Sequence, residues 1–439
     1  MQAGYVADYE AIERDLPGWE VPWLANMREA SLERFAELGF PGPRNEDWKY
    51  TNVRPLERPR FHPGQLDERV DEASLMPYLL GGQSACRLVF VNGHFSPRLS
   101  MSKELPSGVT VTGLAETIEH NPELLEEYLS DSVERTADGF AALNMALMSD
   151  GACVRIGRGV ALERPIHLLF VHSGDQETAV HLRNLVVLEE GAQASLVESY
   201  VALEDGRFMT NVATEAVVGA NAGLDHYKLA MENENTYHIA NTHARVDRDG
   251  RYFNHNITTG GRLVRNDLRS ELRAEGADCE LNGLSLLRGR QHVDNHTRID
   301  HWKPHCTSRE WYKGVLDDHS RSVFTGRVVV HPNAQKTDAQ QANNNLLLSD
   351  NAEADSRPQL EIYADDVKCS HGATAGQIDE EALFYLRSRA VGESAARQLL
   401  IYAFASDIVD RMRLPALQKQ VQNRLTGRLL SGQALEGLV

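Results

Sequence analysis

The sequence predicts a mainly β protein in which a long solenoid lies between two helical regions. Three observations lead to this prediction. Short apolar stretches of four to six residues fill the middle of the 439-residue chain, a turn signal returns among them at regular intervals, and helical periodicity is confined to the ends and one insertion. We expect an N-terminal helical region over 1–85, a core over 86–375 with a helical insertion near 115–148, and a C-terminal helical region over 376–439.

The first predicted element is an amphipathic helix over 23–39, which a Pro-Gly-Pro sequence ends. Its expected apolar face consists of Trp23, Met27, Ala30 and Leu38. The sequence NEDWKYTNVRPL follows over 45–56. There Asn45 is placed to cap a short turn, and the favoured interpretation of Trp48 and Tyr50 is that both pack against the core.

Seven apolar stretches predict the strands of the core. They are RLVFV, IHLLFV, NLVVLEE, TEAVVG, GLSLL, RVVV and LEIYA. Between them, GAQASL at Gly191 and GANAGL at Gly219 share the pattern G-A-x-A-x-L, and GADCEL at Gly276 keeps part of it. Together with Gly250 of an Asp-Gly pair, these glycines lie 28, 31 and 26 residues apart along the chain.

A loose period of this size is typical of a solenoid, because each coil needs several short strands and corners and cannot bury its apolar face alone. Helices of about 10 to 15 residues between strands would indicate βαβ units, and no such pattern separates the repeats. An antiparallel β-sandwich is the alternative, since short strands with frequent turns also fit that architecture.

Helical periodicity returns within the insertion and after the core. A helix is predicted near 138–148, and a shorter, weaker one over 124–129. The first prediction rests on four residues that recur at three and four positions, namely Phe140, Leu143, Asn144 and Leu147.

Three further helices are predicted after Gly376. Asp379 is a credible N-cap of the first helix, and Gly392 is expected to end it. The second helix ends before Pro415, and the third is expected over 417–430. The apolar stripe expected on the second helix consists of Ala396, Leu399, Leu400, Ala403, Phe404 and Ile408.

Composition narrows the possible functions. With 45 Lys and Arg against 63 Asp and Glu, the formal charge is −18, which argues against electrostatic binding of nucleic acid. The longest unbroken apolar run, from Leu399 to Ala405, is far shorter than the roughly 20 residues of a membrane span, so no membrane association is expected. Five cysteines without CxxC spacing, and the lack of a secretory signal, predict reduced thiols in a cytoplasmic protein.

Standard catalytic signatures are absent from the sequence. It contains no Gly-Lys dipeptide and hence no phosphate-binding P-loop, so we expect this chain to bind no nucleotide. No GxGxxG opens a helix after a strand, and neither GxSxG nor HExxH occurs. We therefore predict no catalytic residue, and any chemistry must come from a less common set of side chains.

Histidines gather between positions 292 and 306. Imidazole and thiolate are ligands of zinc and iron, so this density is a candidate metal site. The intervals of four, five and four residues, however, do not keep all four imidazoles on one face of a strand. We favour corner and surface histidines that hydrogen-bond neighbouring coils. The residues concerned are His292, His296, His301, His305 and Cys306, with Asp294 and Asp300 nearby.

Cys369 and His371 form a sharper candidate. If the strand that begins at Ile362 continues through them, residues two apart point to the same face, and a thiolate and an imidazole lie side by side. This pair suits iron, copper or zinc, although a tetrahedral site needs two more donors, for example from a partner chain. The alternative is a buried cysteine beside a strand-end histidine, with no ligand role for either.

Three segments together resemble a known family. They are NEDWKYTNVRPL, the sequence of more than 50 residues over 336–389, and the helix after Gly392. These segments are similar to SufD-type scaffold subunits of the SUF iron-sulfur cluster assembly machinery, within the SufB/SufD family. The similarity runs from about Pro43 to Met412. In SufB-type subunits we expect a His-Glu-containing sequence in place of 369–374, which favours the SufD type.

The resemblance implies a right-handed parallel β-helix with helical regions at both ends. It implies pairing with a SufB-like subunit through the core, and docking of a SufC-like ATPase on the helices between Glu380 and Leu430. Cys369 and His371 would lie at the scaffold interface and hold iron or a nascent cluster, while the SufB-like subunit supplies the sulfur-accepting thiolate. The chain itself is then a non-catalytic scaffold and not an enzyme.

Two other functions fit the sequence less well. Parallel β-helices include polysaccharide lyases and hydrolases, but those enzymes are commonly exported, and no export signal is visible here. A homo-oligomeric structural protein without a ligand is the third option, and the isolated chain is a possible homodimer. The sequence leaves open the cluster type, the binding of a flavin to the complex and the role of the first 40 residues.

Overall fold

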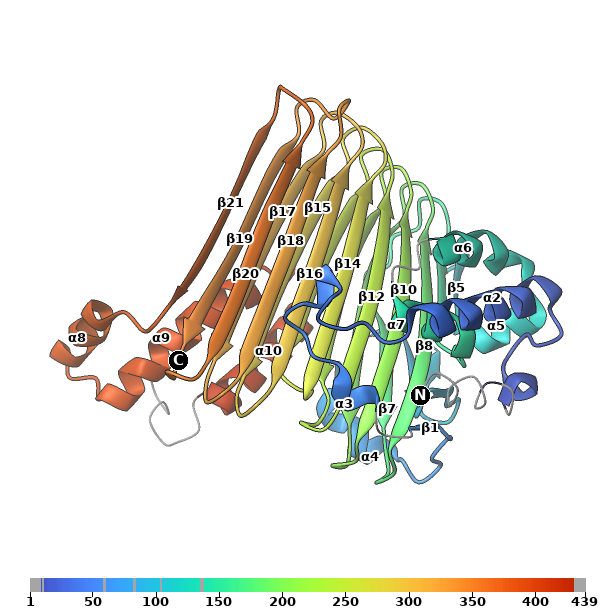
Figure 1. Ribbon diagram of the computed structural model, residues 1–439, viewed down its shortest axis with the longest axis horizontal. Coiled ribbons are helices and arrows are strands. Elements are labelled where there is room, and N and C mark those ends of the chain that lie inside the picture. The colour runs from blue at the N-terminus through green and yellow to red at the C-terminus, as the bar shows by residue number, and fades with distance from the viewer. Residues whose placement is uncertain are drawn as a thin grey trace.

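The computed structural model is a two-sheet β-solenoid with helices at both ends, which confirms the predicted mainly β fold class. Figure 1 shows the long strands side by side, with blue and teal helices at one end and orange helices at the other. Parallel pairing between successive coils excludes the antiparallel sandwich. The structure describes residues 9, 12–57, 61–81, 84–102, 105–134 and 138–429.

Consecutive strands of the core alternate between two facing sheets. Sheet A contains, in spatial order, β20 (Glu353–Ile362), β18 (Arg321–Val330), β16 (His292–His301), β14 (Leu263–Leu272), β12 (Tyr237–Val246), β10 (Phe208–Val218), β8 (Thr178–Leu188), β6 (Ala152–Ile156) and β5 (Val109–Gly113), and β1 (His62–Pro63) pairs with β8. Sheet B contains β21 (Lys368–Gly376), β19 (Asp338–Leu347), β17 (Thr307–Leu316), β15 (Asp278–Leu287), β13 (Arg251–Thr258), β11 (Gly223–Met231), β9 (Gln193–Ala202), β7 (Ile166–His172), β2 (Cys86–Val91) and β3 (His94–Phe95), and β4 (Met101–Ser102) pairs with β2.

Each regular coil gives one long strand to each sheet, instead of the several short strands that the sequence predicted. β16 and β18, for example, have 10 residues each. The apolar stretches mark only part of each strand, because the backbone of the next coil pairs with polar positions as readily as with apolar ones.

The register of the sheets confirms the predicted period. In sheet B, Gln193 pairs with Gly223 and Gly223 with Arg251, which are steps of 30 and 28 residues. In sheet A, Tyr237 pairs with Leu263, a step of 26 residues. Successive coils therefore stack with nearly constant length, and residues one coil apart share a column on the same face.

The glycines that revealed the repeat do not all occupy the same place in a corner. Gly191 and Gly276 are left-handed, with φ of +72° and +75°. In the two coils between them, Asn221 and Asp249 take this position with φ of +57° and +53°. His305 takes it in the coil that follows, with φ of +61°. Because Asn, Asp and His enter this conformation more readily than most residues, the repeat is one of backbone conformation and not of glycine alone.

The helices at the N-terminal end lie over both sheets: most cover the outer face of sheet A, and the two short helices within 72–78 pack against β2 and β7 of sheet B. They are η1 (Glu13–Asp15), α2 (Pro22–Leu38), η2 (Glu46–Trp48), α3 (Arg54–Glu57), α4 (Glu72–Leu75), η3 (Met76–Tyr78), α5 (Leu114–His120), α6 (Glu123–Glu134) and α7 (Gly139–Leu147). α7 lies on β8 and β10, and α2 packs on α7. The predicted face of α7 is buried, and the side chain of Asp138 caps it by accepting from the backbone N–H groups of Phe140 and Ala141.

The predicted apolar face of α2 is correct at Met27 and in part at Trp23, which packs half-buried on the same cluster, and wrong at Ala30 and Leu38, which are exposed. The side chains that α2 buries are Leu24, Met27, Arg28, Ser31, Leu32 and Phe35. Arg28 belongs to this face because its guanidinium donates to the carbonyl oxygens of Ala146 and Met148 at 2.9 and 3.0 Å. These carbonyls lie at the C-terminal end of α7, where backbone acceptors lack partners within the helix. A search for apolar periodicity therefore misses the buried stripe of α2, because the stripe contains a charged residue.

The C-terminal helices are α8 (Glu380–Ser388), α9 (Glu393–Val409) and α10 (Pro415–Leu429). Asp379 caps α8 as predicted, because its side chain accepts from two backbone N–H groups of the first turn. Gly392 does not end α8, since the helix stops at Ser388 and Ala390 turns the chain with φ of +65°. Gly392 is instead the N-cap position of α9. Leu430, the expected end of the third helix, lies outside the described residues.

The helix α9 lies on the outer face of sheet B, over β15 and β17. Its predicted stripe is correct at Ala396 and Ile408, but Ala403 is exposed. The residues that α9 buries are Ala396, Ile401, Ala405, Ile408 and Val409. Within the part of the chain that the structure describes, every helix is too short or too polar to cross a membrane.

The interior between the sheets changes character along the solenoid. Near its N-terminal end, the rings of Phe90, Phe170 and Tyr200 stack with centroids 5.0 and 4.7 Å apart. Glu198 lies two residues before Tyr200 and accepts a hydrogen bond from its hydroxyl at 2.7 Å. Lys228 pairs with Glu198 in the next coil and donates to Asn266 at 2.7 Å. Buried charged side chains therefore occur next to the apolar stack of rings, and each has a polar partner.

Candidate functional site

β21 is the last strand of sheet B and the most exposed of the long strands. Eight of its nine residues are exposed, and Cys369 is half-buried. It pairs with β19 on one side, and no strand among the described residues pairs with its other side. Figure 1 shows β21 at the outer edge of the solenoid. An edge of this length presents a row of unpaired backbone groups to a partner.

Cys369 and His371 lie two residues apart on β21, opposite Ala339 and Gln341 of β19. Cys369 packs against a small apolar cluster, so its side chain faces the inside of the last coil. This cluster includes Val328, Val330, Ala334, Ala339 and Ala364. His371 shares that side of the strand and is exposed. The predicted side-by-side arrangement of a thiol and an imidazole is therefore present at the open end of the interior.

Partial burial raises the pKa of the Cys369 thiol above its ordinary value. The thiol is then protonated at neutral pH, whereas the thiolate is the form that binds metals. A cation next to the sulfur would favour the thiolate and lower that pKa again. Around this pair the described residues supply no third His, Cys, Asp or Glu that would complete a metal site. Among the described residues, this place therefore offers two potential metal donors and no third.

Two polar residues that sequence analysis did not single out lie inward of His371. Gln341 pairs with His371, and Glu310 of β17 pairs with Gln341, so the three share one column of sheet B. The amide Nε2 of Gln341 donates to Glu310 Oε2 at 2.5 Å, and both side chains are buried. Burial raises the pKa of Glu310 to about 7. No local pattern marks them, because the column exists only once the register of the coils is known.

The histidines between positions 292 and 306 are dispersed into separate contacts. His292 shares a hydrogen bond with Thr51 Oγ1 at 3.0 Å, and His301 shares one with Ser308 Oγ at 2.9 Å. His305 turns a corner. The favoured interpretation is correct for His305, but His292 bonds the N-terminal segment and His301 the next strand of its own coil instead of a neighbouring coil, and His301 lies in the core. Across the described ranges, no three His, Cys, Asp or Glu side chains are placed to hold a metal ion.

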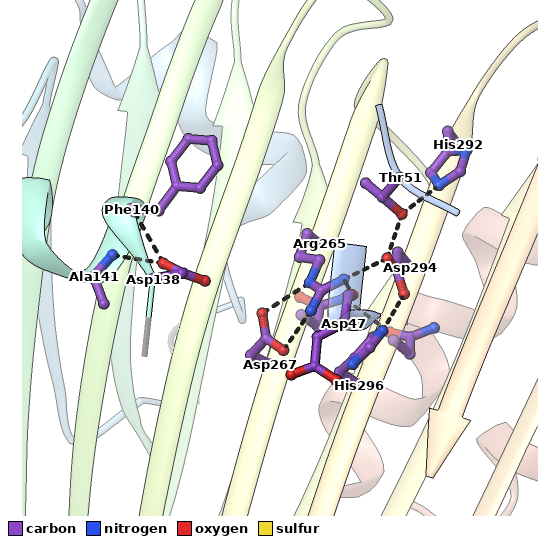
Figure 2. Close-up of polar contacts among 12 residues, drawn as sticks. Asp47, Thr51, Asp138, Phe140, Ala141, Arg265, Asp267, His292, Asp294 and His296 are labelled. Atoms are coloured by element: carbon purple, nitrogen blue, oxygen red, sulfur yellow. Dashed lines mark hydrogen bonds and ion pairs between the residues drawn. The ribbon is translucent and has the colours of Figure 1, made fainter. Parts of the chain in front are cut away.

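The segment 45–56 docks on the outer face of sheet A around Arg265. Figure 2 shows the Arg265 guanidinium between Asp267 and Asp294. It donates to Asp294 at 2.6 Å and to the backbone oxygen of Asp47 at 2.7 Å. The ring of Trp48 lies 4.0 Å from the guanidinium and is buried, which confirms its predicted packing on the core. This segment therefore acts as a clamp on the solenoid wall, with a buried cation as its anchor.

Two details of the same segment differ from prediction. Asn45 precedes η2 as expected, but its side chain makes no capping bond. Its Oδ1 instead accepts from the backbone N–H of Gly42 at 3.0 Å and turns the preceding chain. Tyr50 is only half-buried, with the guanidinium groups of Arg321 and Arg357 each 5.8 Å from its ring centre. Tyr50 therefore lies at the rim of the clamp.

A cavity of about 440 Å³ lies next to this clamp. Three arginines that line it, Arg269, Arg298 and Arg327, occupy equivalent positions of β14, β16 and β18. Each has a carboxylate partner: Glu271 at 3.0 Å, Asp300 at 2.7 Å and Glu361 at 3.4 Å, respectively. The arginine column is therefore neutralised by carboxylates beside it, and it joins successive coils on the outer face of sheet A.

The helix α8 presents an apolar surface at the other end of the molecule. Phe384 and Tyr385 are 73% and 58% exposed, among the largest values for aromatic residues in the described chain. Glu380 and Glu381 lie on the same shallow surface. Figure 1 shows α8 projecting beyond β21. Exposed aromatic pairs of this kind are common where a partner binds.

Models of one protein family match most of the chain. Residues 1–168 match the SufBD protein N-terminal region, and residues 170–404 match the SufBD core domain of the SUF system for FeS cluster assembly. This chain belongs to the SufBD family. The core match begins within β7, so the repetitive part of the solenoid is the family's core domain.

Several SufBD relatives are similar over nearly their full length. An iron-sulfur cluster assembly SufBD family protein from Synechocystis is 34% identical over 94% of this chain and 93% of the relative. Iron-sulfur cluster assembly protein SufD from Escherichia coli is 34% identical over 91% and 92%, and SufD from Bacillus subtilis is 26% identical over 92% and 93%. This SufBD member is thus an iron-sulfur cluster assembly protein, and a polysaccharide-active enzyme is not favoured.

Proposed function

We propose that this chain is a non-catalytic scaffold subunit that pairs with a SufB-like subunit through the exposed end of its solenoid. The observation that carries the proposal is β21, an edge strand of nine residues with little cover of its own. Its neighbour in the last coil, β20, is likewise only partly covered. Folded proteins normally cover or interrupt a long edge, so a partner that adds a strand or coil completes this one.

Cys369 and His371 are the proposed ligands for iron or a nascent iron-sulfur cluster, which is the cargo of the complex. A thiolate and an imidazole on one face supply two of the donors that such a site needs. The SufB-like subunit supplies the remaining ligands and the sulfur-accepting thiolate. Because iron must displace the thiol proton, its affinity rises with pH and falls in acid. The proposed location is the cytoplasm, where the Cys369 thiol and the sulfur-accepting thiol of the SufB-like subunit stay reduced.

A SufC-like ATPase is proposed to dock on the C-terminal helices, while this chain binds no nucleotide itself. Phe384 and Tyr385 of α8 are the proposed anchors, because aromatic side chains dominate the energy of many interfaces. α9 and α10 cannot be removed to test this, since they bury residues such as Ile408 and Val421 on sheet B. We expect Phe384→Ala with Tyr385→Ala to weaken ATPase binding at least tenfold, and Trp302→Ala, an exposed aromatic on a corner, to leave it unchanged.

The metal role is tested in complexes purified anaerobically at matched subunit ratios. We expect Cys369→Ser with His371→Ala to lower iron and cluster content while the subunits still assemble. The matched control is Cys153→Ser with His305→Ala, which changes a half-buried thiol and an exposed corner histidine elsewhere. Equal iron in the wild-type and Cys369/His371 complexes would reject the metal role.

The pairing surface is tested separately from the metal. Replacing Ala375 of β21 by Pro removes a backbone donor from the exposed edge without changing Cys369 or His371, because the N–H of Lys368, and with it those of every second residue, points to β19 instead. We expect the heteromeric complex to weaken, and also any homodimer that the isolated chain forms through the same edge. A complex of unchanged stability would show that the SufB-like subunit binds elsewhere.

A further inference from the structure

The column that contains His371 continues into the buried interior. His371 of β21, Gln341 of β19 and Glu310 of β17 occupy paired positions in successive strands. Neighbouring parallel strands lie about 4.8 Å apart, so the Gln341 side chain stands between an exposed imidazole and a buried carboxylate. Gln341 is 3% exposed and Glu310 is fully buried. The only polar route from His371 into the interior along this column therefore passes through one amide.

The orientation of that amide is set by its neighbours. Its Nε2 donates to Glu310 Oε2 at 2.5 Å. Gly326 of β18, on the facing sheet, makes room for it, because a Cβ atom at this position would lie 2.2 Å from Nε2. The carbonyl oxygen Oε1 of Gln341 is buried and has no hydrogen-bond partner in the described structure. An acceptor in this state is unfavourable unless a donor reaches it under some condition.

We propose that Gln341 is a positioning residue for His371: its Oε1 accepts the N–H of one ring nitrogen and leaves the other ring nitrogen for iron. Glu310 acts behind it, by holding Nε2 so that the oxygen faces β21. This inference rests on the proposed metal role of His371, and it adds two residues to that site. Gln341 and Glu310 contact no iron themselves.

The chemistry of histidine ligands explains why such a residue is needed. A neutral imidazole has one N–H and one lone pair on its ring nitrogens, and only the lone pair binds a metal. An acceptor that takes the N–H fixes both the tautomer and the angle of the ring. On an exposed edge strand, where little packing holds His371, this hydrogen bond is the available means of orientation. Loss of such a partner commonly lowers metal affinity about 10- to 100-fold.

The first test does not involve iron. In the full-length chain labelled with ¹⁵N-histidine, the His371 signals are identified by their loss in His371→Ala, and they report its tautomer and the hydrogen bond of its ring N–H. We expect Gln341→Leu to change both. Gln340→Leu is the matched control, since Gln340 is the adjacent residue of β19 and is exposed on the opposite face. Identical His371 signals in the wild type and Gln341→Leu would overturn the inference.

Conservative variants separate positioning from packing. Gln341→Glu keeps an oxygen toward His371 and an acid that can donate to Glu310, so it should retain the wild-type tautomer. Gly326→Ala keeps Gln341 but displaces its amide, so it should reproduce the change seen in Gln341→Leu. Failure of Gly326→Ala to alter His371, in a chain with an unchanged melting transition, would count against the proposed orientation.

The second test measures iron in the anaerobic heteromeric complex. Gln341→Leu should weaken iron binding about 10- to 100-fold, and Gln341→Glu should restore most of it. Iron binding that is insensitive to Gln341→Leu overturns the positioning role even if the tautomer changes. If instead Cys369→Ser with His371→Ala retains full iron, the proposed metal role fails, and the tautomer measurement still decides whether Gln341 orients His371.

Discussion

The two ends of the solenoid are built differently. At the N-terminal end, β2 pairs with the antiparallel strands β3 and β4, and β5 turns back on β6, so the chain covers its own first coils. At the C-terminal end, β20 and β21 each have one parallel neighbour and leave their outer edges unpaired among the described strands. Exposure is therefore a property of one end and not of the fold, and the proposed pairing uses that end.

Two buried carboxylates, one nearer each end, also differ in their pKa values. Glu232, in the coil after β11, is buried, but His238 at 3.0 Å and Thr210 at 2.7 Å outweigh its desolvation and hold its pKa at about 2. Glu310 has only the neutral neighbours Thr297 and Gln341, and burial raises its pKa to about 7. Polar neighbours thus keep Glu232 ionised, whereas Glu310, nearer the open end, has no cationic neighbour among the described residues to do so.

The largest expected effect lies at the covered end. Phe170 stacks between Phe90 and Tyr200 in the interior, so Phe170→Ala should lower the free energy of unfolding by about 3–5 kcal/mol. Urea unfolding of the isolated chain measures this loss. A decrease below about 1 kcal/mol would mean that the N-terminal coils contribute little to cooperative stability, and the contrast between the two ends would disappear.

The second effect depends on pH and concerns Glu310. Its ordinary pKa is 4.5 and its native pKa about 7, so the folded state retains a proton that the unfolded state releases between these values. The stability that this group contributes is complete below pH 4.5 and is lost as pH rises through 7, by up to roughly 3 kcal/mol. Glu310→Gln removes this loss, so its stability relative to wild type should increase steadily from pH 5 to pH 8.

A carboxylate with the opposite shift provides the control. Glu232 has a depressed pKa, so its contribution is present above pH 4.5 and is lost only as pH falls toward 2. Glu232→Gln should therefore destabilise the chain at neutral pH, with no gain between pH 5 and 8. Parallel pH profiles for the two variants would contradict the difference between the two buried carboxylates.

A smaller effect is expected in the helix that projects past the open end. Asp379 caps α8 through the backbone N–H groups of Glu381 and Ala382, so Asp379→Ala should cost about 1 kcal/mol of local stability. Because α8 packs mainly on α9, hydrogen exchange should accelerate in α8 and stay unchanged in the solenoid. Faster exchange throughout sheet B would show that α8 is part of the cooperative core.

The smallest effect on stability is expected at the candidate site itself. Cys369→Ser with His371→Ala changes one half-buried and one exposed residue of an edge strand, so the free energy of unfolding should move by less than about 0.5 kcal/mol. Iron content of the complex should nevertheless decrease. A destabilisation comparable to that of Phe170→Ala would indicate that these residues support the fold, and the loss of iron would then say nothing about ligation.

Much of this arrangement was predictable from local sequence. The caps at Asp138 and Asp379, the strand alternation that pairs Cys369 with His371, and the period of the coils depend on residues that are close in the chain or that repeat. The glycine signal located the coils but not the corner position, because Asn221, Asp249 and His305 adopt the same left-handed backbone without glycine. The stripe of α2 was missed since a buried arginine lies within it.

The sequence by itself determined that this chain stacks coils of 26 to 31 residues between helical ends and carries a thiol and an imidazole side by side near the last strand. Only the tertiary structure decided that this strand is an uncovered edge, that Gln341 stands between His371 and Glu310, and that His292 and His301 serve separate contacts. The physical reason is that coil lengths vary by several residues. The register of one coil on the next is therefore set by backbone pairing and corner geometry, and no local pattern of side chains encodes which residues share a column.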